Sequence, residues 1–103
     1  MESQTPVSDN RYGLELTEHA LSDLIDILAF THRTWGERQR QEYKHKIDEA
    51  FQTIAANPHA GQQRHGLMVY SAGRSRIFYD IRDNLVIVIR ILHDRMDAAR
   101  HLP

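Results

Sequence analysis

The apolar run at residues 85–92 constrains the fold of this chain more than any other segment. It reads Leu-Val-Ile-Val-Ile-Arg-Ile-Leu, so it is rich in β-branched residues and contains a single charge, Arg90. A strand that is apolar on both faces normally lies inside a sheet, where other layers cover both sides. The run therefore predicts a central strand, and the rest of the chain has to supply its neighbours and its cover.

Three other segments are expected to form the sheet together with this strand. Residues 74–81 precede it across a short turn at residues 82–84, and residues 67–71 precede those across a turn that contains glycine. Residues 11–16 alternate between polar and apolar side chains, as a half-buried strand does. Because short turns join antiparallel strands, the sheet is expected to be small, four-stranded and mostly antiparallel.

Two amphipathic helices are expected between the first and the second strand. The first spans residues 18–35, with Thr17 as its N-cap. Its predicted core stripe follows the i, i+3, i+4, i+7 spacing and consists of Leu21, Leu24, Ile25, Leu28 and Trp35. The second spans residues 37–57 and ends before Pro58, because a residue that precedes proline is disfavoured in the α region. Only Gly36 separates the helices, which predicts an antiparallel helical hairpin.

These elements predict an α+β fold in one domain over residues 11–103, with the hairpin packed on the sheet and a short C-terminal tail. Residues 1–10 are polar and are expected to form a flexible N-terminus. No segment reaches the roughly 20 apolar residues of a membrane span, and no signal peptide is visible. We therefore expect no membrane association and a cytoplasmic location. The absence of cysteine excludes disulfides, a thiol nucleophile and a thiolate zinc site.

The formal net charge of −1 conceals an asymmetry between the two halves of the chain. Residues 1–58 hold six Lys/Arg against ten Asp/Glu, whereas residues 59–103 hold seven Arg against four Asp. This basic excess is much smaller than that of a typical nucleic-acid-binding domain. A protein partner fits it at least as well, and direct sequence-specific binding of nucleic acid is not expected.

The polar tail at residues 93–102, dense in Arg, His and Asp, is the main candidate for function. In a metal-free ribonuclease, His93 would serve as the acid or base, and Arg90 or Arg76 would bind the phosphate. Tyr79 would then be an auxiliary donor. In the alternative, aspartates and arginines of the tail pair with one another and only hold it in place.

Other chemistries find less support in the residues. The potential metal ligands of the tail match no ligand motif; they are His93, Asp94, Asp97 and His101. There is no Gly-x-Ser-x-Gly nucleophile elbow and no glycine-rich phosphate loop. No metal, no cofactor and no nucleophilic catalysis is therefore expected, and the ribonuclease interpretation stays open at this point.

Two apolar residues of the first helix, Ile27 and Phe30, lie off its predicted core stripe. Phe30 projects about 180° from Leu21 on a helical wheel. Such residues are either exposed without a function, or contact the helix of a partner protein, or pack on the second helix of the hairpin. The sequence alone leaves the three interpretations open.

Four segments give the chain a resemblance to a known family. They are residues 16–20 (Leu-Thr-Glu-His-Ala), 57–61 (Asn-Pro-His-Ala-Gly), 76–79 (Arg-Ile-Phe-Tyr) and 91–102 (Ile-Leu-His-Asp-Arg-Met-Asp-Ala-Ala-Arg-His-Leu). On these residues, over about 12–102, the chain resembles the ParE branch of the ParE/RelE superfamily. Its members are toxins of bacterial type II toxin–antitoxin modules.

The resemblance implies a RelE/ParE-like fold and a toxin that inhibits DNA gyrase without being an enzyme. It also implies neutralisation by a ParD-like antitoxin, whose flexible C-terminal segment folds onto the toxin. The candidate antitoxin anchors, chosen from their helical positions, are Ile27, Phe30, Trp35 and Tyr43. The candidate gyrase-directed residues of the tail are His93, Arg95, Met96, Asp97, Arg100 and Leu102.

Two other classes of protein remain as alternatives. RelE-like members of the superfamily are ribosome-dependent mRNA endonucleases with a basic groove and a terminal tyrosine or histidine. This chain has only two lysines, both in the second predicted helix, and no tyrosine after Tyr79. The remaining alternative is a binding domain without toxicity. For the tail itself, a structural role, in which Met96 and Leu102 dock it on the core while Arg95 and Asp97 fix its shape, is compatible with the gyrase-directed one.

Overall fold

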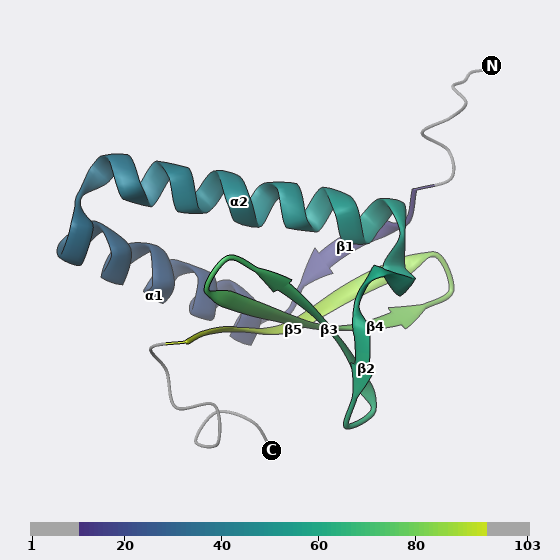
Figure 1. Cartoon of the computed structure of the whole chain (residues 1–103). Helices are drawn as coiled ribbons and strands as arrows, with labels where there is room; N and C mark the ends of the chain where they lie inside the picture. Colours follow the sequence, from purple (N-terminus) through teal and green to yellow (C-terminus); the bar gives the residue numbers. More distant parts are fainter. Residues whose placement is uncertain (1–10, 95–103) are drawn as a thin grey trace.

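A five-stranded mixed sheet forms the base of the molecule, and two helices pack on one of its faces (Figure 1). The computed structural model describes residues 11–94. The strand order is β1-β5-β4-β3-β2, in which β1 is parallel to β5 and every other pair is antiparallel. The strands are β1 Gly13–Leu16, β2 Gln62–Arg64, β3 Leu67–Ala72, β4 Ser75–Arg82 and β5 Leu85–His93. The predicted α+β class and the interior position of the apolar run are confirmed.

The sheet has one strand more than the predicted four. The additional strand is β2, whose three residues pair with β3 across a tight turn at His65 and Gly66. Both turn residues have positive φ, 52° and 83°, as a type I′ hairpin requires. The sequence Gln-Gln-Arg of β2 is fully polar and exposed, so it carries no alternating pattern that could predict a strand.

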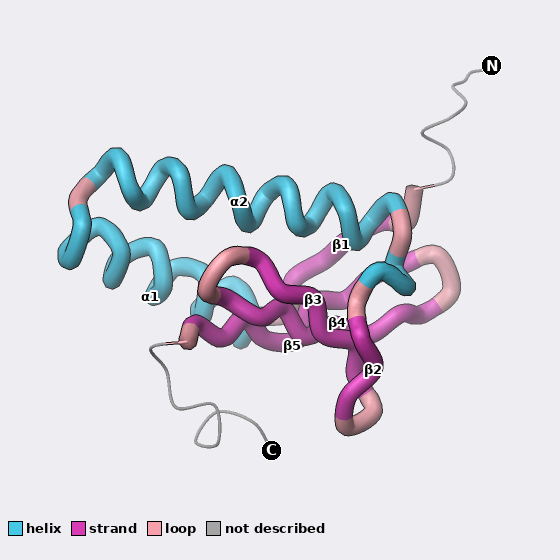
Figure 2. The backbone as a smooth tube through the Cα atoms, viewed as in Figure 1, coloured by secondary structure: helices cyan, strands magenta, loops and turns pink. Residues whose placement is uncertain are grey.

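The helical hairpin is confirmed. α1 (Glu18–Trp35) and α2 (Glu37–Ala56) run antiparallel, joined at Gly36, whose φ of 94° favours glycine (Figure 2). Thr17 is the N-cap of α1: its Oγ1 accepts a hydrogen bond from the Ala20 amide at 3.1 Å and donates one to the Ile89 carbonyl at 2.9 Å. This second bond fixes the start of α1 to the central strand.

The predicted core stripe of α1 is wrong in part: Leu24 packs against the core as predicted, but the centre of the buried face is rotated by about one residue. The buried residues of this helix are Ala20, Asp23, Ile27 and Thr31. Leu21, Ile25 and Trp35 are instead 51%, 58% and 46% exposed. Two of the buried side chains are polar, and both have hydrogen-bond partners inside the fold. Asp23 accepts from the Ile91 amide of β5, and the Thr31 hydroxyl donates to the Ile27 carbonyl, so their burial is not penalised.

A β-bulge in β5 decides which of its side chains reach the core. Phe78 pairs with Arg90 whereas Tyr79 pairs with Val88, so Ile89 is the extra residue. Without the bulge, strict alternation would place Arg90 on the same face as Val88. With it, Ile91 joins the core between sheet and helices, which is built from Ile47, Ile54, Ile77, Tyr79, Val86, Val88 and Ile91.

Candidate functional site

Four aromatic side chains from three elements meet at the end of β5. They come from α1, α2 and β5, and they are Phe30, Trp35, Tyr43 and His93. We call this group, with the cavity of about 400 Å³ beside it, the aromatic pocket. The cavity is lined by Thr31, Trp35, Gln39, Glu42, Tyr43, Lys46, Gly73, Arg74 and His93.

His93 is the centre of the aromatic pocket. Its ring lies 6.0 Å from the ring of Phe30 and 5.7 Å from that of Tyr43, centroid to centroid. These separations and the tilted or edge-on orientations are those of favourable aromatic pairs. His93 pairs with Ser75 of β4 and lies two residues after the core residue Ile91, so its side chain is on the helix-facing side of the sheet. It is only 4% exposed.

The position of His93 corrects its assignment to the tail. It is the last residue of β5 and is buried, rather than the first residue of a surface segment. The backbone amide of Asp94 donates a hydrogen bond to the Arg74 carbonyl at 2.8 Å, which holds the strand end against the β3–β4 turn. The other predicted tail residues lie outside the described part of the chain; they are Arg95, Met96, Asp97, Arg100 and Leu102.

The predicted antitoxin anchors divide into two groups. Phe30, Trp35 and Tyr43 come together in the aromatic pocket, where Phe30 and Trp35 pack edge to face at 5.8 Å. Ile27 does not join them: it is 2% exposed and belongs to the core under the helices. The prediction of Ile27 as a direct contact is therefore wrong, because the rotation of α1 turns this residue toward the sheet.

One buried polar group of the aromatic pocket has no hydrogen-bond partner within the described chain. The Tyr43 hydroxyl is buried and has no hydrogen-bond partner there. Burial, and next the nearby Asp94 carboxylate, raise the pKa of Tyr43 well above its usual range, so the phenol remains a hydrogen-bond donor even at moderately alkaline pH. A buried hydroxyl without an acceptor is costly, and an incoming ligand group could satisfy it.

The residues proposed for ribonuclease chemistry are not brought together. Arg90 forms a two-point ion pair with Asp23, Nε to Oδ2 at 2.7 Å and Nη2 to Oδ1 at 2.9 Å. The Tyr79 hydroxyl is buried and donates to the Pro58 carbonyl at 2.6 Å. Arg76 pairs with Leu92, one position from the Ser75–His93 pair, and so lies on the opposite face of the sheet from His93.

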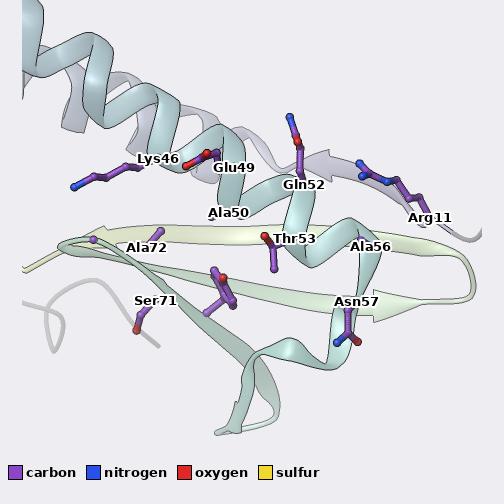
Figure 3. A pocket seen from close by; sticks show the side chains of 12 residues that line it. Arg11, Lys46, Glu49, Ala50, Gln52, Thr53, Ala56, Asn57, Ser71 and Ala72 are labelled. Atoms are coloured by element: carbon purple, nitrogen blue, oxygen red, sulfur yellow. The ribbon is translucent and has the colours of Figure 1, made fainter. Parts of the chain in front are cut away.

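Two further hollows flank β3, and no sequence pattern predicted them. The first, of about 660 Å³, lies between α2 and β3 and is shown in Figure 3. We call it the α2–β3 groove; its walls include Lys46, Glu49, Ala50, Thr53, Tyr70, Ser71 and Ala72. The second, of about 470 Å³, includes Arg64, His65, Tyr70, Ser71 and Arg76, and we call it the basic hollow.

Metal and membrane sites are not found in residues 11–94. No group of three or more histidine and acidic side chains converges there as a metal site would require. Within the same residues, neither helix is both long enough and apolar enough to cross a membrane.

Comparison with known proteins points to one family. The family model described as "ParE toxin of type II toxin-antitoxin system, parDE" matches residues 14–98. Toxin ParE1 of Mycobacterium tuberculosis is 34% identical over 92 residues, which cover 84% of this chain and 94% of the relative. Toxin ParE1 of Caulobacter vibrioides is 32% identical over 91 residues, with the same coverage of 84% and 94%.

Solved structures share the fold at lower sequence identity. A structure of the chromosomal ParDE toxin–antitoxin system from P. aeruginosa superposes with a TM-score of 0.70 at 14% identity, covering 82% of this chain and 97% of that one. The toxin–antitoxin complex RelBE2 from Mycobacterium tuberculosis gives 0.55 at 22% identity, covering 81% and 98%.

Proposed function

Because this chain belongs to the ParE toxin family of type II toxin–antitoxin systems, we propose that it inhibits DNA gyrase and is neutralised by a ParD-like antitoxin. The action is that of a cytoplasmic, non-enzymatic inhibitor. The observation that carries the proposal is the aromatic pocket at the end of β5, which joins the helical hairpin to the point where the tail begins.

The surface beside this pocket supports an antitoxin as the occupant. Leu21 and Ile25 are more than half exposed and lie on the same helical stripe as Trp35 at the pocket. An exposed apolar stripe that leads into an aromatic pocket suits an amphipathic helix of a partner, which would cover the stripe and insert one side chain at the end. An antitoxin on this surface would also cover the end of β5, where the predicted tail begins.

A non-enzymatic action is supported by the state of the polar side chains. Arg90 is committed to Asp23, and Tyr79 is committed to the Pro58 carbonyl, so neither is available to a phosphate group. Of the two exposed arginines of β4, Arg76 faces away from His93, and Arg82 lies at the other end of the strand, opposite Leu85. Acid–base cleavage of RNA requires these groups within hydrogen-bond reach of one substrate.

The test is a supercoiling assay with purified gyrase, relaxed plasmid and this protein. We expect loss of supercoiling and accumulation of cleaved DNA complexes, both reversed when the antitoxin is added first. Unchanged gyrase activity at micromolar protein would refute the gyrase target. Cleavage of ribosome-bound transcripts with gyrase unaffected would replace it by the ribonuclease function.

A variant pair tests the location of the antitoxin. Trp35→Ala removes an exposed anchor of the aromatic pocket and should weaken neutralisation by about tenfold or more, as loss of a large aromatic anchor commonly does. His45→Ala, on the exposed side of α2, is the matched control and should leave neutralisation unchanged. Equal neutralisation of both variants would place the antitoxin elsewhere.

A further inference from the structure

The edge of the sheet at β3 is only partly covered within the described chain. β2 pairs with Leu67, Met68 and Val69 and extends no further, whereas β3 continues to Ala72. The segment Tyr70–Ala72 therefore has β4 on one side and no described strand on the other. A strand edge of this kind presents backbone groups that can pair with another chain.

The register determines which backbone groups point outward. Gly73 and Arg74 form the two-residue turn between β3 and β4, and Ala72 pairs with Ser75 at its base. In such a hairpin the closing pair is hydrogen-bonded, and hydrogen-bonded and non-hydrogen-bonded pairs alternate along the ladder. Ser71 is the next residue, so its N–H and C=O point away from β4, toward the open edge.

The two hollows lie on either side of this edge. Tyr70 and Ser71 line both the α2–β3 groove and the basic hollow, so the edge is the boundary between them. Figure 3 shows Ala72 pointing toward α2 and Ser71 pointing away from it. The α2–β3 groove thus opens on the helix side of the sheet, and the basic hollow on the other side.

The hollows differ in chemistry. The basic hollow contains Arg64, His65 and Arg76 and no acidic residue, and no described carboxylate forms an ion pair with either arginine. The α2–β3 groove has a small-residue floor at Ala50, Thr53 and Ala72, and its charged side chains, Arg11, Lys46 and Glu49, are of mixed sign. Side chains of an added strand alternate between the two faces of the sheet.

We propose that the β3 edge at Tyr70–Ala72 binds an extended segment of a partner protein by strand addition. The segment places alternate side chains in the two hollows: small apolar ones in the α2–β3 groove and acidic ones in the basic hollow. Main-chain hydrogen bonds at Ser71 supply affinity, and the alternating apolar–acidic pattern supplies specificity. The inference rests on the proposed function in one respect, namely that the antitoxin is the protein that provides this segment.

The first experiment uses two synthetic peptides, one with alternating valine and glutamate and one with the same residues in two blocks. Binding to the full chain is followed by amide chemical shifts and amide hydrogen exchange. We expect the alternating peptide to bind at least about tenfold more tightly than the block peptide and to protect the Ser71 amide from exchange. Equal binding of the two peptides, or an unprotected Ser71 amide, would overturn the strand-addition mode.

Variants separate the backbone contribution from the charge contribution. Ser71→Pro removes the outward N–H at an edge position, where proline is tolerated, and should weaken peptide binding by about tenfold.

The double variant Arg64→Glu/Arg76→Glu reverses the charge of the basic hollow and should also weaken peptide binding by about tenfold. Arg33→Glu/Arg38→Glu, the same change on exposed helix positions, is the matched control and should leave binding within about twofold. Weakening by the control as large as by the hollow variant would overturn the assignment of charge to this site.

Other occupants of the edge give distinct results. Shifts at Arg64 and Arg76 with a short RNA but not with the peptide would assign the basic hollow to nucleic acid and refute the proposal. A concentration-dependent dimer in analytical ultracentrifugation that Ser71→Pro abolishes would assign the edge to a second copy of this chain and would also refute it.

The antitoxin itself distinguishes this inference from the proposed function. If the antitoxin neutralises gyrase inhibition but leaves the Ser71 amide unprotected, the strand-addition site is refuted and the proposed function stands. If the antitoxin neither binds nor neutralises while the alternating peptide still protects Ser71, the proposed function fails and the edge remains a peptide-binding site.

Discussion

At the scale of single residues, some side chains have structural roles that their chemical class does not predict. Asp23 is the clearest example, since a carboxylate in the second turn of a helix is ordinarily solvated. Here it accepts hydrogen bonds from the Arg90 guanidinium and from the Ile91 amide at 2.9 Å. The Ile91 amide lies beyond the last residue that pairs with β1, so Asp23 substitutes for a missing strand at the edge of β5.

Replacing Asp23 by Asn should therefore destabilise the fold measurably. The change removes the charge that faces the partly buried Arg90 guanidinium at 2.7–2.9 Å, and loss of a charged hydrogen-bonding partner typically costs about 1–3 kcal/mol. Urea unfolding followed by circular dichroism would measure it. Asp48→Asn, which removes the exposed partner of Lys44, is the control and should cost no more than about 0.5 kcal/mol. Similar losses for both variants would show that the Asp23 ion pair is no stronger than a surface pair.

At the scale of elements, the short connection from α2 to β2 depends on one tyrosine of β4. The Tyr79 hydroxyl donates to the Pro58 carbonyl at 2.6 Å and accepts from the Gly61 amide at 3.2 Å, and so fixes both ends of the 3-10 helix η2 (Pro58–Ala60). A Cβ on Gly61 would lie 2.6 Å from this hydroxyl and 2.7 Å from the Val69 carbonyl oxygen. Glycine is needed here for close approach.

Tyr79→Phe should lower stability by about 1–3 kcal/mol, because the Pro58 carbonyl, which is buried, and the Gly61 amide, which is partly buried, both lose the hydroxyl as hydrogen-bond partner. Gly61→Ala should also destabilise, since the Val69 carbonyl cannot move without disturbing the β2–β3 pairing. Gly13→Ala is the control: its Cβ would meet the end of the flexible Leu85 side chain at 3.2 Å. Thermal unfolding of the three variants measures the differences, and a Gly61→Ala protein as stable as Gly13→Ala would contradict the close-approach argument.

At the scale of the whole molecule, the sequence predicted the order of helices and main strands because each leaves a periodic pattern. It failed where geometry depends on contacts between distant residues. The burial of Ile27 follows from the rotation of α1, which Asp23 and Thr17 fix through bonds to β5. Neither the β-bulge at Ile89 nor the polar strand β2 produces a periodic pattern of apolar residues in the sequence. The aromatic pocket was partly predictable, since Phe30, Trp35 and Tyr43 are candidate antitoxin anchors by their helical positions, although only Phe30 was expected off the core stripe.

Alkaline pH should act on the stability of the whole molecule through two tyrosines. Burial raises the pKa of both Tyr43 and Tyr79, with the Asp94 carboxylate contributing at Tyr43, while tyrosines of the unfolded chain titrate near about 10. Above that pH the unfolded chain loses phenolic protons that the folded chain keeps, so ionisation favours unfolding. Stability should therefore be fully retained below about pH 10 and decline progressively above it. Urea unfolding at about pH 8 and about pH 11 should show a smaller decline for Tyr43→Phe than for the unaltered protein; an equal decline would mean that Tyr43 does not resist ionisation in the fold.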